Sequence, residues 1–195
     1  MRLILATSNK GKVREIKALC EDFEVIPYSE LMDEFEIIED GADFKENALI
    51  KARAVFKALN EDDIVVIADD SGISIDVLDG RPGIYSARYA GESATDKDNL
   101  YKVIDEIKAK KVESSPAHYT AAIAIVTKNS EYVVHGWMYG EAIAKAVGDG
   151  GFGYDPMFIP LGYEKTLGEL DDEVKKSLSH RAKALSLAKV ILQTL

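Results

Sequence analysis

Two adjacent carboxylates in the first half of the chain are the residues best suited to metal chemistry. Asp69 and Asp70 directly follow Ile64–Ala68, an apolar run that is typical of a buried strand. Unpaired charge is costly at such a position, because the surroundings have a low dielectric constant. Mg²⁺ would offset this cost, since it accepts one or two protein carboxylates and completes its shell with water and phosphate oxygens. The alternative is a polar turn between two strands.

A lysine-containing segment after the first apolar run is suited to holding phosphate. Thr7–Lys12, with the sequence TSNKGK, follows Arg2–Ala6 and opens a helical pattern over Lys10–Glu21. Free backbone N–H groups and the positive end of the helix dipole are expected there. Lys10 and Lys12 are electrostatically misplaced at this helix end unless an anion lies beside them. A triphosphate would be such an anion; the alternative is a solvated loop with surface lysines, because the Walker spacing is lacking.

A glycine-rich segment with two aromatic residues is suited to binding a nucleobase. Gly150–Pro156 has the sequence GGFGYDP, and its glycines let the backbone approach a ligand closely. A base could stack on Phe152 or Tyr154 while Asp155 or a main-chain group contacts its polar edge. The alternative is a glycine hinge whose aromatic side chains belong to the core.

The last predicted helix carries two cations at its N-terminus. Ser179 is a good N-cap, whereas His180 and Arg181 lie where the helix dipole disfavours positive charge. An acceptor is therefore expected, either a keto oxygen of a base or a phosphate, with Lys175 as a further donor. The alternative is that nearby acidic residues balance these charges, namely Glu169, Asp171, Asp172 and Glu173.

The elements that must position these segments alternate between strand and helix at the start of the chain, which predicts an α/β fold with an antiparallel middle. Apolar runs and alternation predict strands at Arg2–Ala6, Ile64–Ala68, Ile73–Leu78, Tyr119–Thr127, Glu131–Gly140 and Glu141–Ala146. Helical periodicity predicts helices at Lys10–Glu21, Asp43–Asn60, Asp96–Lys111 and Ser179–Leu195. Asp43 and Glu46 are spaced like a capping box. Asp79–Ser93 is predicted to be a long functional loop.

Composition and charge exclude several classes of function. With 195 residues, 47% of them hydrophobic, the chain can bury the core of one cooperative unit. Its one cysteine, Cys20, excludes an intrachain disulfide and a thiolate metal cage, so a cytoplasmic location is the default expectation. A formal charge of −10 argues against non-specific nucleic-acid binding. No apolar run resembles a signal peptide or approaches the roughly 18 residues that span a bilayer, so no membrane partner is expected.

Several strings along the chain, in this order, resemble the inosine triphosphate pyrophosphatase family: TSNKGKVRE, ENALIKA, ADDSG, GRPGIYSARYAG, GGFGYDP and SHRAKAL. The resemblance implies one domain over residues 1–195, with an elongated mixed parallel and antiparallel sheet, flanking helices and two lobes around an active-site cleft. It also implies hydrolysis of inosine, xanthosine and related purine triphosphates, ribo or deoxy, to the monophosphate and pyrophosphate. Mg²⁺ is the implied cofactor, and the implied assembly is a homodimer.

The resemblance assigns roles to individual residues. Glu39 and Asp70 would bind the metal, and Asp70 is also the candidate base that activates water. The substrate would be bound by Thr7, Ser8, Asn9, Lys10, Gly11, Lys12 and Lys51 at its phosphates, by Ser71, and by Phe152, Gly153, Tyr154, Asp155, Lys175, His180 and Arg181 around the base. Glu36 is an alternative to Glu39, and Lys176 to Lys175.

Base discrimination is expected to follow from polarity. Donors from His180, Arg181 or Lys175 would pair with a 6-keto oxygen, whereas a 6-amino group would leave buried donors unpaired at about 1–3 kcal/mol each. Two other functions stay open. One is a septum-associated nucleotide pyrophosphatase, which prefers other bases and which the GGFGYDP and SHR strings disfavour. The other is a non-catalytic nucleotide sensor.

Overall fold

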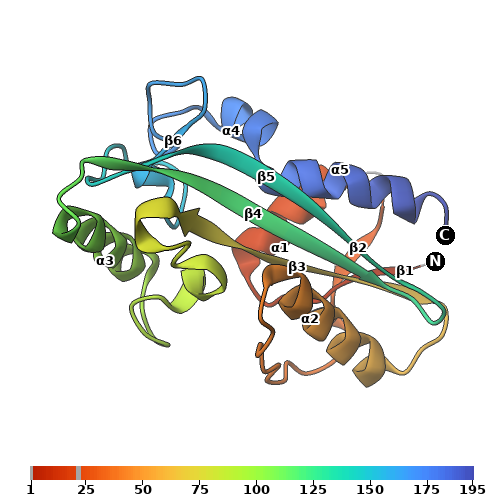
Figure 1. The fold of residues 1–195 in the computed structure, drawn as a ribbon. Helices are drawn as coiled ribbons and strands as arrows, with labels where there is room; N and C mark the ends of the chain where they lie inside the picture. The colour runs from red at the N-terminus through yellow and green to blue at the C-terminus, as the bar shows by residue number, and fades with distance from the viewer. Residues whose placement is uncertain (1, 21–22) are drawn as a thin grey trace. The chain divides into compact units, whose positions relative to one another are not determined.

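The strands of the protein form a mixed sheet. The computed structural model describes residues 2–20 and 23–195, except for the side chains of Lys10 and Leu19. The strands are β1 Arg2–Leu5, β2 Val25–Pro27, β3 Ile64–Ile75, β4 Ser114–Val126, β5 Glu131–Ile143 and β6 Phe158–Pro160. Within the described residues they make one six-stranded sheet in the order β2-β1-β3-β4-β5-β6. β1 is parallel to β2 and β3, and β6 is antiparallel to β5 (Figure 1).

Helices flank this sheet, so the predicted α/β class with a mixed sheet is confirmed. The α-helices are α1 Lys10–Leu19, α2 Phe44–Leu59, α3 Asp96–Ala109, α4 Asp172–Leu178 and α5 His180–Leu192. The 3₁₀ helices are η1 Tyr28–Glu30, η2 Asp76–Leu78, η3 Gly83–Arg88 and η4 Asp155–Met157. Helix α4 and strands β2 and β6 were not predicted, because segments this short give no clear period. Of the helices in the described part of the chain, none has the length and apolar composition needed to cross a membrane.

The chain divides into two compact units. The first unit comprises Met1–Asp70, Ala121–Gly136 and Arg181–Leu195, and the second comprises Ser71–Thr120 and Trp137–His180. Strands β3, β4 and β5 each contribute residues to both units. Each unit has its own buried cluster of apolar side chains and its own group of predicted site residues.

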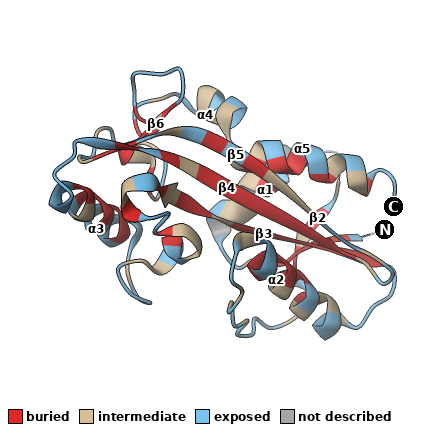
Figure 2. Ribbon diagram, in the orientation of Figure 1, coloured by how far each residue is buried: buried red, intermediate tan, exposed pale blue. Residues whose placement is uncertain are grey.

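Helices cover both faces of the sheet in the first unit (Figure 1). On one face, Ala48 of α2 belongs to the same buried cluster as Val66 of β3. On the other face, Ile16 of α1 and Leu185 of α5 share a cluster with Ile67. Successive side chains of a strand point to opposite faces, so a strand covered on both faces is apolar throughout. Figure 2 shows these strand segments as buried.

The core of the second unit lies between α3 and the other ends of the long strands. Val103 and Ile107 of α3 cluster with Ile73 of β3 and with Phe158 of β6. The buried Tyr119 of β4 belongs to the same cluster. This core supports the glycine-rich segment that was predicted to bind the base.

In two places the sequence predicted two strands where the structure has one. β3 runs without a break from Ile64 to Ile75, so Asp69 and Asp70 lie inside a strand and not beyond a strand end at Ala68. The ladder can continue because cationic side chains compensate both carboxylates. The predicted separate strand at Glu141–Ala146 is the end of β5, which continues to Ile143. The alternation of polar and apolar residues does not reveal such continuity when glycine or aspartate interrupts it.

Candidate active site

The two predicted metal ligands lie on either side of one lysine. Lys51 of α2 is buried, and its Nζ is 2.9 Å from Glu39 Oε2 and 2.7 Å from Asp70 Oδ1. Burial alone would lower the pKa of Lys51, but the charges of Asp70 and Glu39 more than offset burial and raise the pKa. The structure therefore brings Glu39 and Asp70 within reach of a single cation. Glu36, the alternative to Glu39, is exposed.

The loop that carries Glu39 is held against the first turn of α2. The backbone N–H of Gly41 donates to Asn47 Oδ1 at 2.9 Å, and Asn47 is fully buried. The N–H of Glu46 donates to Asp43 Oδ1 at 2.8 Å, so Asp43 is the N-cap of α2, as predicted. The Glu46 carboxylate accepts from the backbone N–H of Ala42 and not from that of Asp43. The reciprocal hydrogen bond of the predicted capping box is therefore displaced by one residue. These contacts fix the distance between Glu39 and the helix that carries Lys51.

One oxygen of the Asp70 carboxylate receives no hydrogen bond from the part of the chain that the structure describes. Oδ1 accepts from Lys51, whereas Oδ2 is buried and has no hydrogen-bond partner among the described residues. Burial raises the pKa of Asp70 above its ordinary value, although Lys51 and Lys12 act in the opposite direction. A buried carboxylate oxygen without a donor is costly unless a cation or a proton occupies it. Ser71, also predicted to contact substrate, is the next residue and is half-buried.

Glu39 and Asp70 together fit a magnesium ion. Within the described ranges, no three or more His, Cys, Asp or Glu side chains gather as a metal cluster. Mg²⁺ does not require one, because it commonly binds one or two carboxylates and keeps water and substrate phosphate oxygens in its other positions. Zn²⁺ would prefer nitrogen or sulfur ligands in a closed set. The oxygen-only pair and the unsatisfied Asp70 oxygen thus favour a hard cation.

A second ion-pair network surrounds Asp69, a residue whose role the motifs did not assign. Lys12 Nζ lies 2.6 Å from Asp69 Oδ2, and Arg181 Nε lies 3.4 Å from Asp69 Oδ1. The Arg181 guanidinium also pairs with Glu15 of α1. Burial alone would raise the pKa of Asp69, but Arg181 and Lys12 more than offset it and hold the pKa well below its usual range. Lys12 and Arg181, far apart in sequence, therefore share one buried carboxylate.

The TSNKGK segment forms the N-terminus of α1, but fewer of its N–H groups are free than predicted. Asn9 is the N-cap, and its Oδ1 accepts from Gly11 N at 2.9 Å and from Lys12 N at 3.1 Å. The N–H of Asn9 donates to Thr7 Oγ1 at 3.2 Å. The expectation that the backbone N–H groups are free is thus wrong for Gly11 and Lys12, which the Asn9 cap satisfies, and for Asn9, which Thr7 satisfies. The Lys10 side chain lies outside the described part.

A cavity of about 490 Å³ adjoins the same segment. Thr7 and Ser8 line it, together with Arg14 and Lys17 on α1. Lys17 is 3.4 Å from Glu30, a pair that is largely exposed and therefore weak. The predicted phosphate segment thus borders a space whose lining includes two cationic side chains and one carboxylate, that of Glu34.

In the predicted base-binding segment, the two aromatic residues differ in environment. Phe152 is 62% exposed, whereas Tyr154 is 5% exposed and its hydroxyl donates to Ser86 O at 2.7 Å. The exposed Phe152 ring is therefore available to stack on a base, whereas the Tyr154 ring packs in the core of the second unit. The Asp155 carboxylate accepts from Phe152 N at 3.2 Å, which closes the segment into a turn. Gly151, with φ +81°, is required there because a Cβ would collide with that carboxylate.

Lys175 and His180 belong to the same unit as this segment. Lys175 Nζ is 2.8 Å from Asp172, and the lysine side chain is 17% exposed, whereas Lys176 is exposed. The Lys175 ammonium also lies beside Gly150. The structure therefore places Lys175, and not Lys176, at the glycine-rich segment. The His180 imidazole stacks on Tyr119, with 4.9 Å between ring centroids.

The largest miss of the sequence analysis was the group of residues that hold the site residues in place. Asp69, Glu15 and Tyr119 each contact a predicted site residue. Glu15 lies three positions after Lys12 on the helix, a spacing that hinted at one face. No sequence pattern pointed to Tyr119, because the alternation of residues along a strand does not show which side chain of another element each residue will contact. The charge of Arg181 is balanced by Glu15 and Asp69, which are not among the acidic residues that the sequence offered as the alternative to a bound acceptor.

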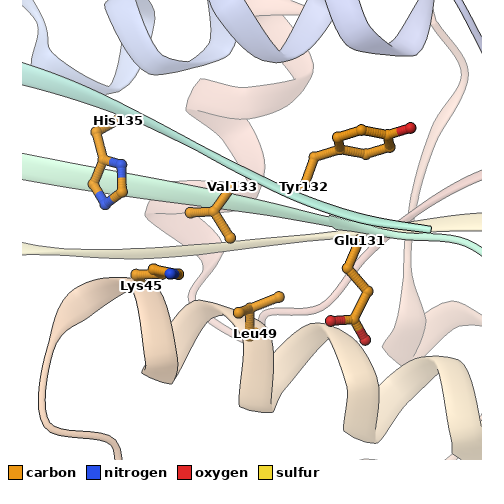
Figure 3. A pocket seen from close by; sticks show the side chains of 6 residues that line it. All are labelled: Lys45, Leu49, Glu131, Tyr132, Val133 and His135. Carbon is orange, nitrogen blue, oxygen red and sulfur yellow. The ribbon is translucent and has the colours of Figure 1, made fainter.

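A second cavity, of about 350 Å³, contains none of the predicted site residues. It lies between α2 and β5 and is lined by Lys45, Leu49, Glu131, Tyr132, Val133 and His135 (Figure 3). Glu131 is engaged by Arg53 of α2. This cavity is not where the predicted chemistry lies.

Comparison with known proteins identifies the family. The Ham1 family model matches residues 3–190. The chain is 74% identical to the dITP/XTP pyrophosphatase of Sulfurimonas denitrificans, with 100% of both proteins covered, and 62% identical to that of Sulfurovum sp., with 100% of this chain and 95% of the relative covered. A solved HAM1 protein from Coxiella burnetii has a TM-score of 0.90 at 34% identity, covering 100% of both chains. The predicted family is confirmed: the chain belongs to the Ham1 family.

Proposed function

We propose that this protein hydrolyses deaminated purine nucleoside triphosphates, such as dITP, ITP and XTP, to the nucleoside monophosphate and pyrophosphate. The observation that carries the proposal is the pair Glu39 and Asp70, which flank one cationic group while a buried Asp70 oxygen has no donor. The names of the relatives, dITP/XTP pyrophosphatases, support this choice of substrate. Removal of such nucleotides would cleanse the nucleotide pool.

Mg²⁺ is the proposed cofactor, with Glu39 and Asp70 as its protein ligands. When bound, it would neutralise phosphate charge and lower the pKa of a coordinated water. Asp70 would accept a proton from the attacking water, because burial raises the pKa of Asp70 above the ordinary carboxyl value. The bond between the α- and β-phosphates then breaks, and pyrophosphate leaves.

The triphosphate is proposed to be held by cations of the first unit and by the capped loop before α1. Lys51 and Lys12 would contact phosphate oxygens. Their ion pairs with Asp70 and Asp69 would then be replaced in part by ion pairs with the phosphates. Thr7, Ser8 and Asn9 would supply hydroxyl and amide groups at the loop. Ser71 would contact the substrate beside Asp70.

The base is proposed to be read by the second unit. Phe152 would stack on the ring, since its side chain is the exposed aromatic of the segment. His180 and Lys175 would donate to the 6-keto oxygen, and Asp155 would contact the opposite edge. Adenine carries a 6-amino group in place of the acceptor, which would leave a donor unpaired at about 1–3 kcal/mol. Arg181 is buried on Asp69 and Glu15, so we assign it to positioning rather than to direct base contact.

A pyrophosphate-release assay tests this proposal. Inosine, xanthosine, guanosine and adenosine triphosphates are each supplied with Mg²⁺, and in parallel with excess EDTA. We expect kcat/KM for inosine and xanthosine triphosphates to exceed that for adenosine triphosphate by about tenfold to a hundredfold, because one unpaired donor costs about 1–3 kcal/mol. EDTA should abolish release. Release from none of the four would refute the enzyme, and equal rates for inosine and adenosine would refute the base contact alone.

We also propose that the protein is a homodimer and that it acts in the cytoplasm, where the nucleotide pool is held. The motif resemblance supports the dimer. Trp137 and Tyr139 of β5 are 42% and 58% exposed, and aromatic surface of this kind is often covered by a partner subunit. Light scattering on the purified full chain should give twice the 21.4 kDa chain mass. A mass of one chain at concentrations of tens of micromolar would contradict the dimer.

A further inference from the structure

One buried tyrosine of β4 contacts the residues that are proposed to read the base. The Tyr119 ring stacks on the His180 imidazole with 4.9 Å between centroids and 15° between planes. It also makes an edge-to-face contact with Phe158, again with 4.9 Å between centroids. Tyr119 is only 8% exposed, so neither ring can turn without disturbing the core of the second unit.

The hydroxyl end of the same tyrosine is associated with Asp155. Burial raises the pKa of Tyr119 well above its ordinary value, and the neighbouring Asp155 and Tyr154 raise it further. The phenol therefore stays protonated, and its buried oxygen makes no hydrogen bond within the described residues. The Asp155 carboxylate instead accepts from Phe152 N at 3.2 Å. The contact of Tyr119 with the proposed base site is thus the stack of its ring on His180.

We propose that Tyr119 is a positioning residue for base recognition, which holds the His180 imidazole in a fixed plane. The proposal rests on the proposed function, because it concerns the same base site. An imidazole N–H donates in the plane of its ring, and a hydrogen bond weakens steeply as its angle departs from linear. A ring whose plane is fixed by stacking therefore aims its donor at one acceptor, and this favours a 6-keto base over a 6-amino base.

The stack on His180 requires the aromatic ring of Tyr119 and not its hydroxyl. Phenylalanine would fill the same space and keep the stack, whereas leucine would remove it. Two variants therefore separate the ring from the hydroxyl. Tyr119→Phe removes only the hydroxyl, and Tyr119→Leu removes both.

The experiment measures kcat and KM for inosine and adenosine triphosphates with Mg²⁺ in both variants. We expect the ratio of kcat/KM for inosine over adenosine to stay within about twofold in Tyr119→Phe, because the stack is kept. In Tyr119→Leu the ratio should fall at least about fivefold, since the imidazole is no longer held in one plane and its hydrogen bond to the base weakens. The kcat for inosine triphosphate should stay within about twofold in Tyr119→Phe, because the proposed base Asp70 is unaffected.

Ile107→Ala is the matched control, since Ile107 is fully buried in the same cluster but is aliphatic and cannot stack on His180. It should lower the melting temperature as Tyr119→Leu does, yet leave the inosine-to-adenosine ratio unchanged. An unchanged ratio in folded Tyr119→Leu would overturn the proposal, and so would a fall in Tyr119→Phe as large as that in Tyr119→Leu. So would an equal change of ratio in Ile107→Ala.

A nucleotide-free measurement separates this proposal from the proposed function. The His180 ring protons, assigned with His180→Gln, should show an upfield ring-current shift that Tyr119→Phe keeps and Tyr119→Leu loses. Absence of that shift in the unsubstituted protein would overturn the positioning role even if the enzyme discriminates bases. If the unsubstituted protein hydrolyses none of the triphosphates, the proposed function fails. The positioning role is then tested by calorimetry, which compares the affinities for inosine and adenosine nucleotides in the Tyr119 variants.

Discussion

Asp70→Asn should lower kcat for inosine triphosphate by roughly 10²- to 10⁴-fold, the range expected when a general base is lost. Asparagine keeps the size of the side chain and a hydrogen-bond acceptor for Lys51, but it cannot take a proton from water. It also weakens metal binding, because a neutral amide oxygen replaces a carboxylate that has a buried, unsatisfied oxygen. Lys51 keeps Glu39 as a partner at 2.9 Å, so the variant should fold.

The measurement pairs single-turnover pyrophosphate release with calorimetric binding of the nucleotide. The expected pattern is a large loss of turnover with an affinity that is reduced much less. Asp63→Asn is the control, since Asp63 is exposed just before the same strand, and its rate should match that of the unsubstituted protein. A rate for Asp70→Asn within about tenfold of that of the unsubstituted protein would remove the role of Asp70 as base, because even the smallest general-base effects exceed this.

Asp69→Asn should lower both stability and phosphate binding, although Asp69 is not proposed to touch the substrate. Its carboxylate is 1% exposed and balances Lys12 and Arg181. Removing one partner from a buried ion pair leaves charge uncompensated and costs about 3–5 kcal/mol. For a chain of this size, that corresponds to a fall in melting temperature of roughly 6–20 °C. Lys12 would lose its fixed position, so KM for the triphosphate should rise.

Two further variants show whether the effect belongs to the buried network. Glu15→Gln removes a partner of Arg181 but none of Lys12, so stability should fall while KM changes little. Glu131→Gln breaks the pair with Arg53, whose side chains are 39% and 53% exposed, and should cost less than about 1 kcal/mol. If Asp69→Asn were no more destabilising than Glu131→Gln, the buried ion pairs of Asp69 would not contribute the stability that is assigned to them here.

The sequence predicted the elements whose pattern is local and long. Helix α2 has a complete apolar face and a good N-cap at Asp43, and both were read correctly from spacing. The hairpin of β4 and β5 was likewise predicted, although both strands extend further than their alternation indicated. β2, β6 and α4 were missed because three to seven residues cannot establish a period.

Charge at the wrong place in the chain was the most informative signal about the site. Lys12 and Arg181 each lie in the first turn of a helix, where the dipole disfavours cations. The sequence alone indicated that both need an anion. It could not indicate that the nearest anion is one shared carboxylate, Asp69, because the three residues meet only when α1 and α5 pack on the same face of β3.

By itself, the sequence determined the fold class, the family and the residue types available for chemistry, since these depend on composition, local period and motif order. Only the tertiary structure decided which side chains compensate one another. Glu39 faces Asp70 across Lys51 because α2 packs on β3, and the ring of Tyr119 on β4 stacks on that of His180, the first residue of α5. Burial and pairing are properties of positions in space, so the preference of a carboxylate for a metal, a proton or a lysine is set only after the chain has folded.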